Sequence, residues 1–222
     1  MYEFNFAPVF ESFDMLLVGA WVTVRMSCLA MMFGLIVAIL GATLKTSGYR
    51  FARIVVSVYV EAIRNTPFLV QIYFIFFALP AIGVRFDPND AALLALVINF
   101  GAYGTEIVRA GIESIGKGQI EAAMAIGLSR LQILRHVVLK PALRTIYPAL
   151  TSQFIYLMLG SSVVSVISAT DLTAAGNDLN SQTFASFEIY SIITMMYLFM
   201  TLMFSVFFTV VGKKVFSYPI GR

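Results

Sequence analysis

Residues 189–212 read IYSIITMMYLFMTLMFSVFFTVVG, and these 24 residues between Glu188 and Lys213 include no charged side chain. A helix that spans a bilayer needs about 20 apolar residues. The stretch is apolar on all sides and shows no alternation of apolar and polar positions, which favours a helix over a strand of a lipid-facing barrel. Because backbone groups in lipid must bond within their own segment, an irregular chain is excluded. The stretch predicts a membrane-spanning helix.

Similar uncharged runs recur along the chain. They contain 19 residues between Arg25 and Lys45, 20 between Arg64 and Arg85, 15 between Asp90 and Glu106, and 26 between Arg144 and Asp171. We therefore expect an all-α membrane protein with about five transmembrane helices, at about 15–44, 53–80, 90–114, 142–168 and 188–212. Pro67 lies inside the second helix and should kink it, because proline removes an N–H and clashes with the preceding turn.

The composition excludes several classes of protein. Of the 222 residues, 59% are hydrophobic and 12% are charged, and the mean hydropathy is +0.87. Soluble domains are about half apolar and about a quarter charged, so a soluble globule and a disordered chain are excluded. With Cys28 and His136 as the sole residues of their types, we predict no disulfide, no metal site and no Cys–His nucleophile. No set of catalytic residues is expected within the spans.

The basic residues predict the orientation of the chain. Cytoplasmic loops of membrane proteins carry an excess of Lys and Arg. One side of the predicted bundle collects eleven of the 15 basic residues, namely Lys45, Arg50, Arg53, Lys117, Arg130, Arg135, Lys140, Arg144, Lys213, Lys214 and Arg222. The other side has Arg85 alone. We expect the N-terminus outside and the C-terminus in the cytoplasm. No basic run with aromatic interleaving indicates nucleic acid.

The connector between the third and fourth predicted helices is long for a membrane protein. Its residues 119–126 are rich in helix formers, and Gly127 stands where a helix-ending glycine is common. Glu121 is expected in the first turn, where a negative charge suits the helix dipole. The alanines that follow it give a low-relief surface suited to a groove in a partner. The sequence therefore predicts a short cytoplasmic helix that contacts another protein.

Several motifs carry a family resemblance. Glu121-Ala122-Ala123 followed by Gly127 resembles the EAA motif of ABC importer permeases. The run YVEAIRNTPFLVQ at residues 59–71 resembles the second-helix signature of the polar amino acid uptake family, and AYGTEIVRAGIESIGKGQ at residues 102–119 resembles the run that leads into its EAA loop. Further matching positions are Pro148, Ser161, Ser162 and the Asp171-Leu172 pair. The resemblance extends over about residues 15–212.

The resemblance implies a fold and a set of partners. It implies a single ABC transmembrane type-1 domain over residues 1–222, with the type I importer (MetI-like) fold, a core at about 15–212 and an EAA coupling loop at about 115–141. The family assembles with a second permease, identical or homologous, with a dimer of cytoplasmic ATP-binding subunits and with a periplasmic or extracellular solute-binding protein. The expected role is uptake of polar amino acids or their derivatives across the bacterial inner (cytoplasmic) membrane. No phosphate-binding Gly-x-x-x-x-Gly-Lys-Ser/Thr motif is present, so ATP and Mg are expected on the partner ATPase, with no cofactor in this chain.

Three groups of residues are candidates for function. The resemblance assigns coupling to the ATPase to Gln119, Glu121, Ala122, Ala123, Ile126 and Gly127. The polar residues expected along a substrate pathway are Gln71, Asn99, Tyr103, Ser161 and Ser162, although interhelical hydrogen bonds would explain them equally well. Two pairs with helical spacing, Glu61 with Arg64 and Glu106 with Arg109, are expected to neutralise each other and brace the bundle.

Two departures from the family pattern leave alternatives open. Lys140-Pro141 stands where relatives usually have Pro-Gln, which shifts the expected helix start. Leu159-Gly160 stands where many have a charged pair expected to face the substrate. Either a partner permease makes the main contacts, so that this chain is the auxiliary half of a heterodimer, or the solute is less charged; the first is favoured. A self-contained carrier or channel is the alternative function, but no internal repeat supports it.

Overall fold

The computed structural model describes residues 4–216, and within them the chain is helical with no strand. Its helices are α1 (Ala7–Glu11), α2 (Phe13–Thr46), α3 (Arg50–Arg64), α4 (Phe68–Tyr73), α5 (Pro88–Glu113), α6 (Lys117–Ala125), α7 (Arg130–Gln132), α8 (Lys140–Gly160), α9 (Leu172–Thr183) and α10 (Ser186–Val215). The π-helices η1 (Phe74–Ala78) and η3 (Ile133–Leu139) and the 3-10 helices η2 (Leu79–Ile82) and η4 (Ser161–Ile167) complete the set. The predicted all-α class is confirmed.

Four helical segments within the described residues are long and apolar enough to span a membrane. They are Phe13–Thr46, Pro88–Glu113, Arg130–Ile167 and Ser186–Val215. The expected first, third and fifth helices therefore have nearly the predicted ends. The fourth span is longer than predicted, because a capping box between Ser129 and Gln132 starts a helix that runs through η3 into α8. α8 itself begins at Lys140, close to the predicted start at about 142, but the helical segment already begins at Arg130.

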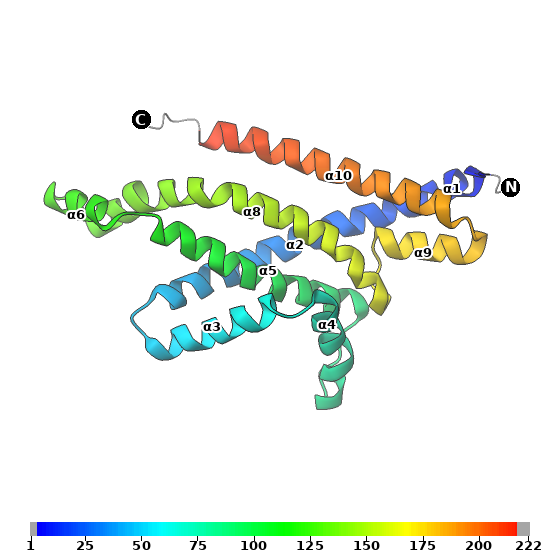
Figure 1. Cartoon of the computed structure of the whole chain (residues 1–222), viewed down its shortest axis with the longest axis horizontal. Helices are drawn as coiled ribbons and strands as arrows, with labels where there is room; N and C mark the ends of the chain where they lie inside the picture. Colours follow the sequence, from blue (N-terminus) through cyan, green and yellow to red (C-terminus); the bar gives the residue numbers. More distant parts are fainter. Residues whose placement is uncertain (1–3, 217–222) are drawn as a thin grey trace.

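The predicted second helix is broken rather than kinked. Its two parts, Arg50–Arg64 and Phe68–Ile82, meet at an angle of 110°. Pro67 has the extended conformation and precedes α4. In Figure 1, α3 runs alongside the bundle, while α4 and the turns after it project away from it. The segment counts as a fifth span if the bent pair is taken as one.

The core of the bundle forms where α2 packs against α5, and small residues allow the close approach. A Cβ on Gly34 would lie 2.8 Å from the Phe100 ring, and one on Gly104 would lie 2.7 Å from Ala38. Phe100 itself is fully buried. A second cluster joins α8, α9 and α10 around Phe154 and Met158. Gly34 and Gly104 therefore serve the close packing of α2 against α5.

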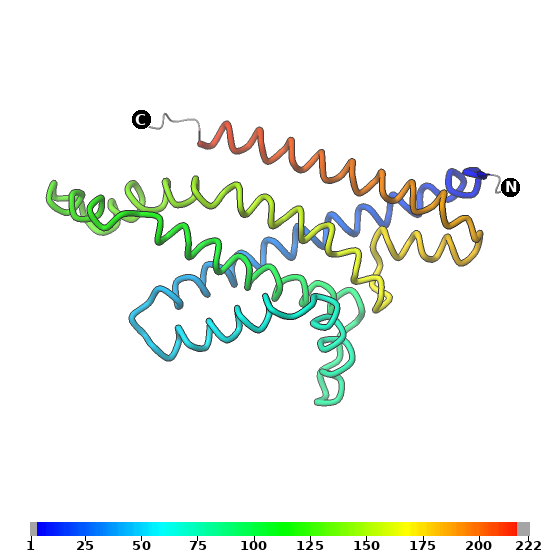
Figure 2. Tube along the Cα trace, in the orientation of Figure 1, coloured from blue at the N-terminus to red at the C-terminus, as the bar shows by residue number. Residues whose placement is uncertain are grey.

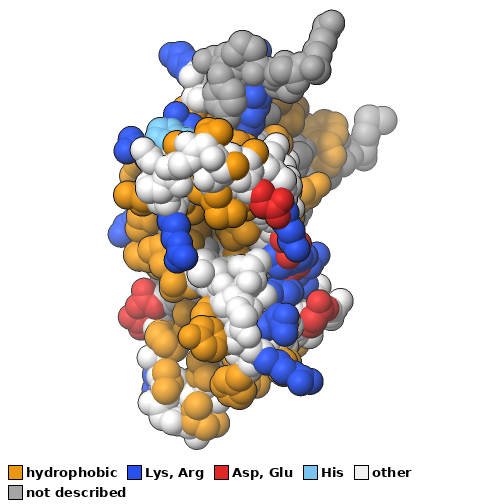
Figure 3. All heavy atoms as spheres, turned by 90° about the vertical axis from the view of Figure 1, so that its left-hand side faces the viewer, with side chains coloured by type: hydrophobic (Ala, Val, Ile, Leu, Met, Phe, Trp, Pro, Cys, Tyr) orange, Lys and Arg blue, Asp and Glu red, His pale blue; other side chains and the backbone are white. Residues whose placement is uncertain are grey.

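The two ends of the bundle differ in position and charge. Figure 2 traces α2 from one end to the other, and α10 finishes at the end where α2 finishes. That end also holds α6, the start of α8 and most of the basic side chains, which gather on the face in Figure 3. α9 lies at the opposite end. We call the end that bears α6 the basic end.

Candidate functional site

The side chain of Gln71 stabilises the break between α3 and α4. A continuous helix would pair the carbonyl of Ile63 with the N–H of residue 67, and Pro67 has none. The Nε2 of Gln71 donates instead to the carbonyl oxygen of Ile63 at 2.7 Å and to that of Thr66 at 3.1 Å. Gln71 is 8% exposed. Its amide therefore replaces the hydrogen bond that the proline removes.

Gln71 also connects the break to α5. The side-chain amide of Asn99 donates to Oε1 of Gln71 at 3.0 Å. Asn99 lines an open cavity of about 400 Å³ between the break, α5 and α8. The residues that line the cavity are Thr66, Phe68, Leu96, Asn99, Tyr103, Gln153, Tyr156, Leu157 and Gly160. The cavity thus combines segments that are far apart in the sequence.

The chemistry of this cavity is polar and uncharged. Its lining offers amides, hydroxyls and aromatic rings, with no Asp, Glu, Lys or Arg. Arg64 does not line the cavity, but its guanidinium lies 5.3 Å from the ring centroid of the lining residue Tyr103. Such a lining can hydrogen-bond a small polar solute and cover its apolar part, as ligand sites commonly do.

The structure brings two of the five predicted pathway residues into this cavity, Asn99 and Tyr103. Gln71 lies behind the wall as a brace. Ser161 is buried and donates to the carbonyl of Met158, and Ser162 donates to that of Leu159, so both hydroxyls bond to their own helical turn. Neither serine lines the cavity.

Three polar lining residues were missed: Thr66, Gln153 and Tyr156. Gln153 and Tyr156 share one face of α8 with Gly160, at helical spacings of three and four residues, and this periodicity was visible in the sequence. Thr66 reaches the cavity because it lies at the break, and the sequence did not indicate how large the angle of that break is. Gly160 is half-buried, and a Cβ there would meet nothing within 4 Å.

The predicted pair of Glu61 and Arg64 is not formed, although that of Glu106 and Arg109 is. Asn65 donates to Glu61 Oε2 at 2.8 Å, while Arg64 faces Tyr103 across the aromatic contact. Helical spacing alone therefore did not predict this ion pair correctly, since Glu61 and Arg64 each contact a different neighbour at the end of α3.

The second pair belongs to a larger network at the basic end. Arg109 Nη2 lies 2.8 Å from Glu106 Oε2, and Lys45 Nζ lies 2.6 Å from Glu106 Oε1. Arg109 also contacts Glu113. The network links the last turn of α2 to α5, whose chain continues directly into α6.

α6 is a short, largely exposed helix with a defined stop. Gly127 adopts φ +81°, its N–H bonds to the carbonyl of Met124, and the N–H of Leu128 bonds to that of Ala123. This is the Schellman pattern, in which a left-handed glycine ends the helix. The helix begins at Lys117, two residues earlier than expected, so Glu121 lies beyond the first turn and the predicted dipole contact is wrong.

The predicted coupling residues divide by exposure. Gln119, Glu121, Ala122, Ile126 and Gly127 are exposed, and Ile126 reaches 77%. Ala123 is 5% exposed, on the face that packs toward η3. Met124, which was not predicted, is 56% exposed. α6 therefore presents apolar side chains to the solvent at the basic end, as an interface helix does.

Known proteins resemble the chain along most of its length. The family model described as "Binding-protein-dependent transport system inner membrane component" matches residues 30–217. The glutamine transport system permease protein GlnP of Escherichia coli K12 is 38% identical over 205 residues, which cover 91% of this chain and 94% of that protein. The L-cystine transport system permease protein TcyB of Bacillus subtilis is 39% identical over 164 residues, covering 74% and 70%.

Solved structures agree. A crystal structure of an amino acid ABC transporter with histidines superposes with a TM-score of 0.89 at 34% identity, over 96% of this chain and 100% of that one. The MetNI methionine ABC transporter gives a TM-score of 0.75 at 21% identity over 92% and 98%, which confirms the MetI-like fold. The chain belongs to the family of inner membrane components of binding-protein-dependent transport systems.

Proposed function

We propose that this permease subunit passes a polar amino acid with an uncharged side chain, such as glutamine, through the cavity at the α3–α4 break. The observation that carries this substrate class is the uncharged, amide- and hydroxyl-bearing lining of that cavity. Relatives at 38% and 39% identity are named for glutamine and L-cystine transport, which supports an amino acid substrate. A carboxamide both donates and accepts hydrogen bonds, so it complements Asn99 and Gln153.

The coupling role is assigned to α6. Its exposed residues Met124 and Ile126 would enter a groove of a cytoplasmic ATP-binding subunit, which binds ATP and Mg and hydrolyses the nucleotide. The basic end would then face the cytoplasm, and the end with α9 would face the solute-binding protein. The positive charge at the basic end supports this orientation. Movement of α6 would reach α2 through α5 and the Lys45–Glu106 contact.

The cavity favours the second of the two interpretations of Leu159-Gly160. Gly160 lies on the cavity wall beside neutral polar groups, so the missing charged pair leaves a neutral site. A solute with an uncharged side chain requires no charge at that position. The second permease of the assembly is accordingly proposed to be an identical copy.

Uptake by the reconstituted complex tests this proposal. The chain, its ATP-binding subunit and its binding protein are placed in proteoliposomes with labelled glutamine, glutamate or arginine. We expect ATP-dependent uptake of glutamine well above that of the two charged amino acids. Faster uptake of arginine or glutamate would contradict the neutral-substrate assignment, and a requirement for a second, different permease would contradict the identical copy.

A further inference from the structure

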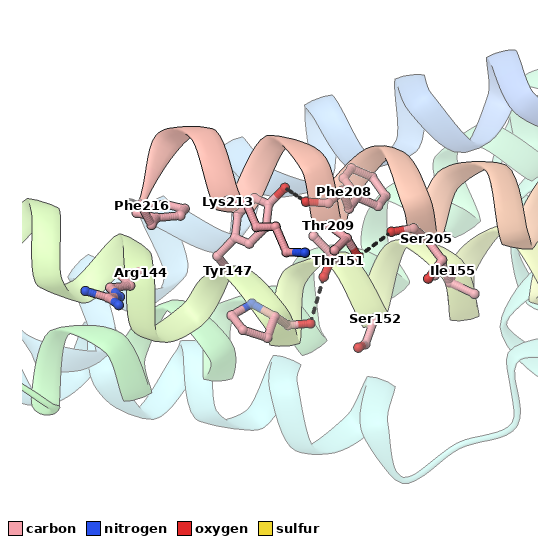
Figure 4. A pocket seen from close by; sticks show the side chains of 12 residues that line it. Arg144, Tyr147, Thr151, Ser152, Ile155, Ser205, Phe208, Thr209, Lys213 and Phe216 are labelled. Carbon is pink, nitrogen blue, oxygen red and sulfur yellow. Dashed lines mark hydrogen bonds between the residues drawn. The ribbon is translucent and has the colours of Figure 1, made fainter. Parts of the chain in front are cut away.

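A second cavity lies away from the proposed substrate path, in a groove between α8 and α10 at the basic end. Its volume is about 490 Å³ (Figure 4). Its lining residues from α8 are centred on Thr151, and those from α10 on Thr209. None of the residues that line the groove also lines the cavity at the α3–α4 break.

Packing at the basic end fixes the shape of this groove. The hydroxyl of Tyr147 donates to the carbonyl of Phe208 at 2.8 Å, and its ring lies 5.2 Å from that of Phe216. A Cβ on Gly212 would come within 2.8 Å of the Tyr147 ring. α8 and α10 are therefore held together at this point. Small side chains farther along both helices leave the space between them open.

The groove contains polar groups that lie along two membrane-spanning helices. The hydroxyls of Thr151 and Thr209 donate hydrogen bonds to backbone carbonyls of their own helices. The hydroxyls of Ser152 and Ser205 have no hydrogen-bond partner among residues 4–216. Polar groups without partners are costly in lipid, so an occupant with oxygen acceptors would be stabilised here.

Two cations and several apolar side chains complete the lining. In Figure 4 the side chain of Lys213 runs along the groove toward Thr151 and Thr209, while Arg144 lies at the end next to Phe216. No Asp or Glu lines the groove. Ile155 and the ring of Phe208 supply apolar surface. The groove therefore combines positive charge and hydroxyl groups with an apolar wall.

We propose that this groove binds one anionic phospholipid of the surrounding membrane. The phosphate would lie between Arg144 and Lys213, the glycerol and ester oxygens would accept from Ser152 and Ser205, and an acyl chain would cover Ile155. Charge complementarity argues for this occupant, because basic pockets between transmembrane helices bind anionic headgroups. The site concerns the lipid environment and is independent of the amino acid that the chain transports.

Native mass spectrometry of the detergent-purified permease–ATPase complex tests the site. Phosphatidylglycerol and phosphatidylethanolamine with matched acyl chains are added, and the bound lipid is counted for wild type and for Arg144→Gln, Lys213→Gln and the double variant. Lys214→Gln is the matched control, since Lys214 is exposed on the same turn and does not line the groove. We expect retention of phosphatidylglycerol over phosphatidylethanolamine, with a loss of about fivefold for each lining charge removed.

Three outcomes would overturn the proposal. The first is equal retention of the two lipids, or an equal loss in Lys214→Gln. The second is full displacement of phosphatidylglycerol by millimolar inorganic phosphate, which would mark a site for free phosphate. The third is efficient disulfide cross-linking between two permease copies through Ser205→Cys, which would show that a second copy covers the groove. A lipid bound in wild type, lost in Lys213→Gln and unaffected by phosphate supports the site.

Discussion

The amide of Asn99 donates to the side-chain oxygen of Gln71 across 3.0 Å, and this bond joins the wall of the cavity to the brace of the broken span. Gln71 in turn bonds to Ile63, whose carbonyl lost its helical partner at Pro67. The polar residue at the break and the polar residue in the cavity therefore form one unit. A change in the brace should alter both the stability of the protein and the position of Asn99.

We expect Gln71→Leu to destabilise the permease by about 1–3 kcal/mol, because the substitution leaves buried polar groups without partners. The apparent midpoint of thermal unfolding in detergent measures the effect. Asn65→Ala is the control, since the Asn65 side chain bonds to Glu61 on an exposed surface and its loss should change little. Equal midpoints for the two variants would show that Gln71 is not a brace.

The long spans could be predicted from sequence because uninterrupted apolar runs have few alternatives in a membrane. The break at Pro67 was expected only as a kink, since its 110° angle depends on Gln71 reaching back to Ile63, a contact that composition does not reveal. The cavity was half predicted: Asn99 stood out as a polar residue in an apolar run, but Gln153 meets it only after α5 and α8 have packed together.

The size of the cavity predicts how substitutions at Gly160 affect uptake. Gly160→Phe should fill the cavity of about 400 Å³ and abolish uptake, while the unfolding midpoint stays near that of wild type, because a Cβ at Gly160 meets no neighbour. Gly160→Ala, the matched control, should retain most of the uptake. Normal uptake by a folded Gly160→Phe protein would place the pathway elsewhere.

Two glycine-to-alanine substitutions, one inside α6 and one at its end, should have opposite effects on the stability of this helix. Gly127→Ala should strain the stop by about 1 kcal/mol and weaken co-purification with the ATP-binding subunit, because φ is +81° there. Gly118→Ala lies inside α6 with no nearby atom, so it should favour the helix and preserve binding. Equal recovery of the ATP-binding subunit with both variants would show that the geometry of α6 does not determine its binding to that subunit.

In the ion network at the basic end, we expect the shared carboxylate of Glu106 to contribute more to stability than the exposed carboxylate of Glu113. Glu106→Gln leaves both Lys45 and Arg109 without their shared carboxylate, so we expect a loss of about 1–2 kcal/mol in stability. We also expect weaker stimulation of ATP hydrolysis by substrate-loaded binding protein. Glu113→Gln removes an exposed contact of Arg109 and should cost less than about 0.5 kcal/mol. Equal effects of the two substitutions would argue against a central role for Glu106.

Asp171 lies outside the membrane-spanning helices, at the end that bears α9. Its carboxylate caps α9 by accepting from the N–H of Ala174 at 2.7 Å, and Tyr197 donates to it at 3.2 Å. The side chain is almost fully buried. Burial disfavours the charged form and raises the pKa of Asp171 to about 6, although the hydrogen bonds from Ala174 and other donors lower it.

This raised pKa predicts a decrease in stability with rising pH. Between the unfolded pKa near 3.9 and the folded pKa of about 6, the folded protein binds more protons, so its stability falls as the pH rises through that window. The pKa difference corresponds to roughly 2 kcal/mol lost by pH 7 relative to pH 4. Asp171→Asn keeps a good N-cap without the titrating group. The unfolding midpoint of this variant should therefore fall less than that of wild type as the pH rises from 4 to 7. Parallel midpoint curves for wild type and Asp171→Asn would show that Asp171 does not contribute to the pH dependence.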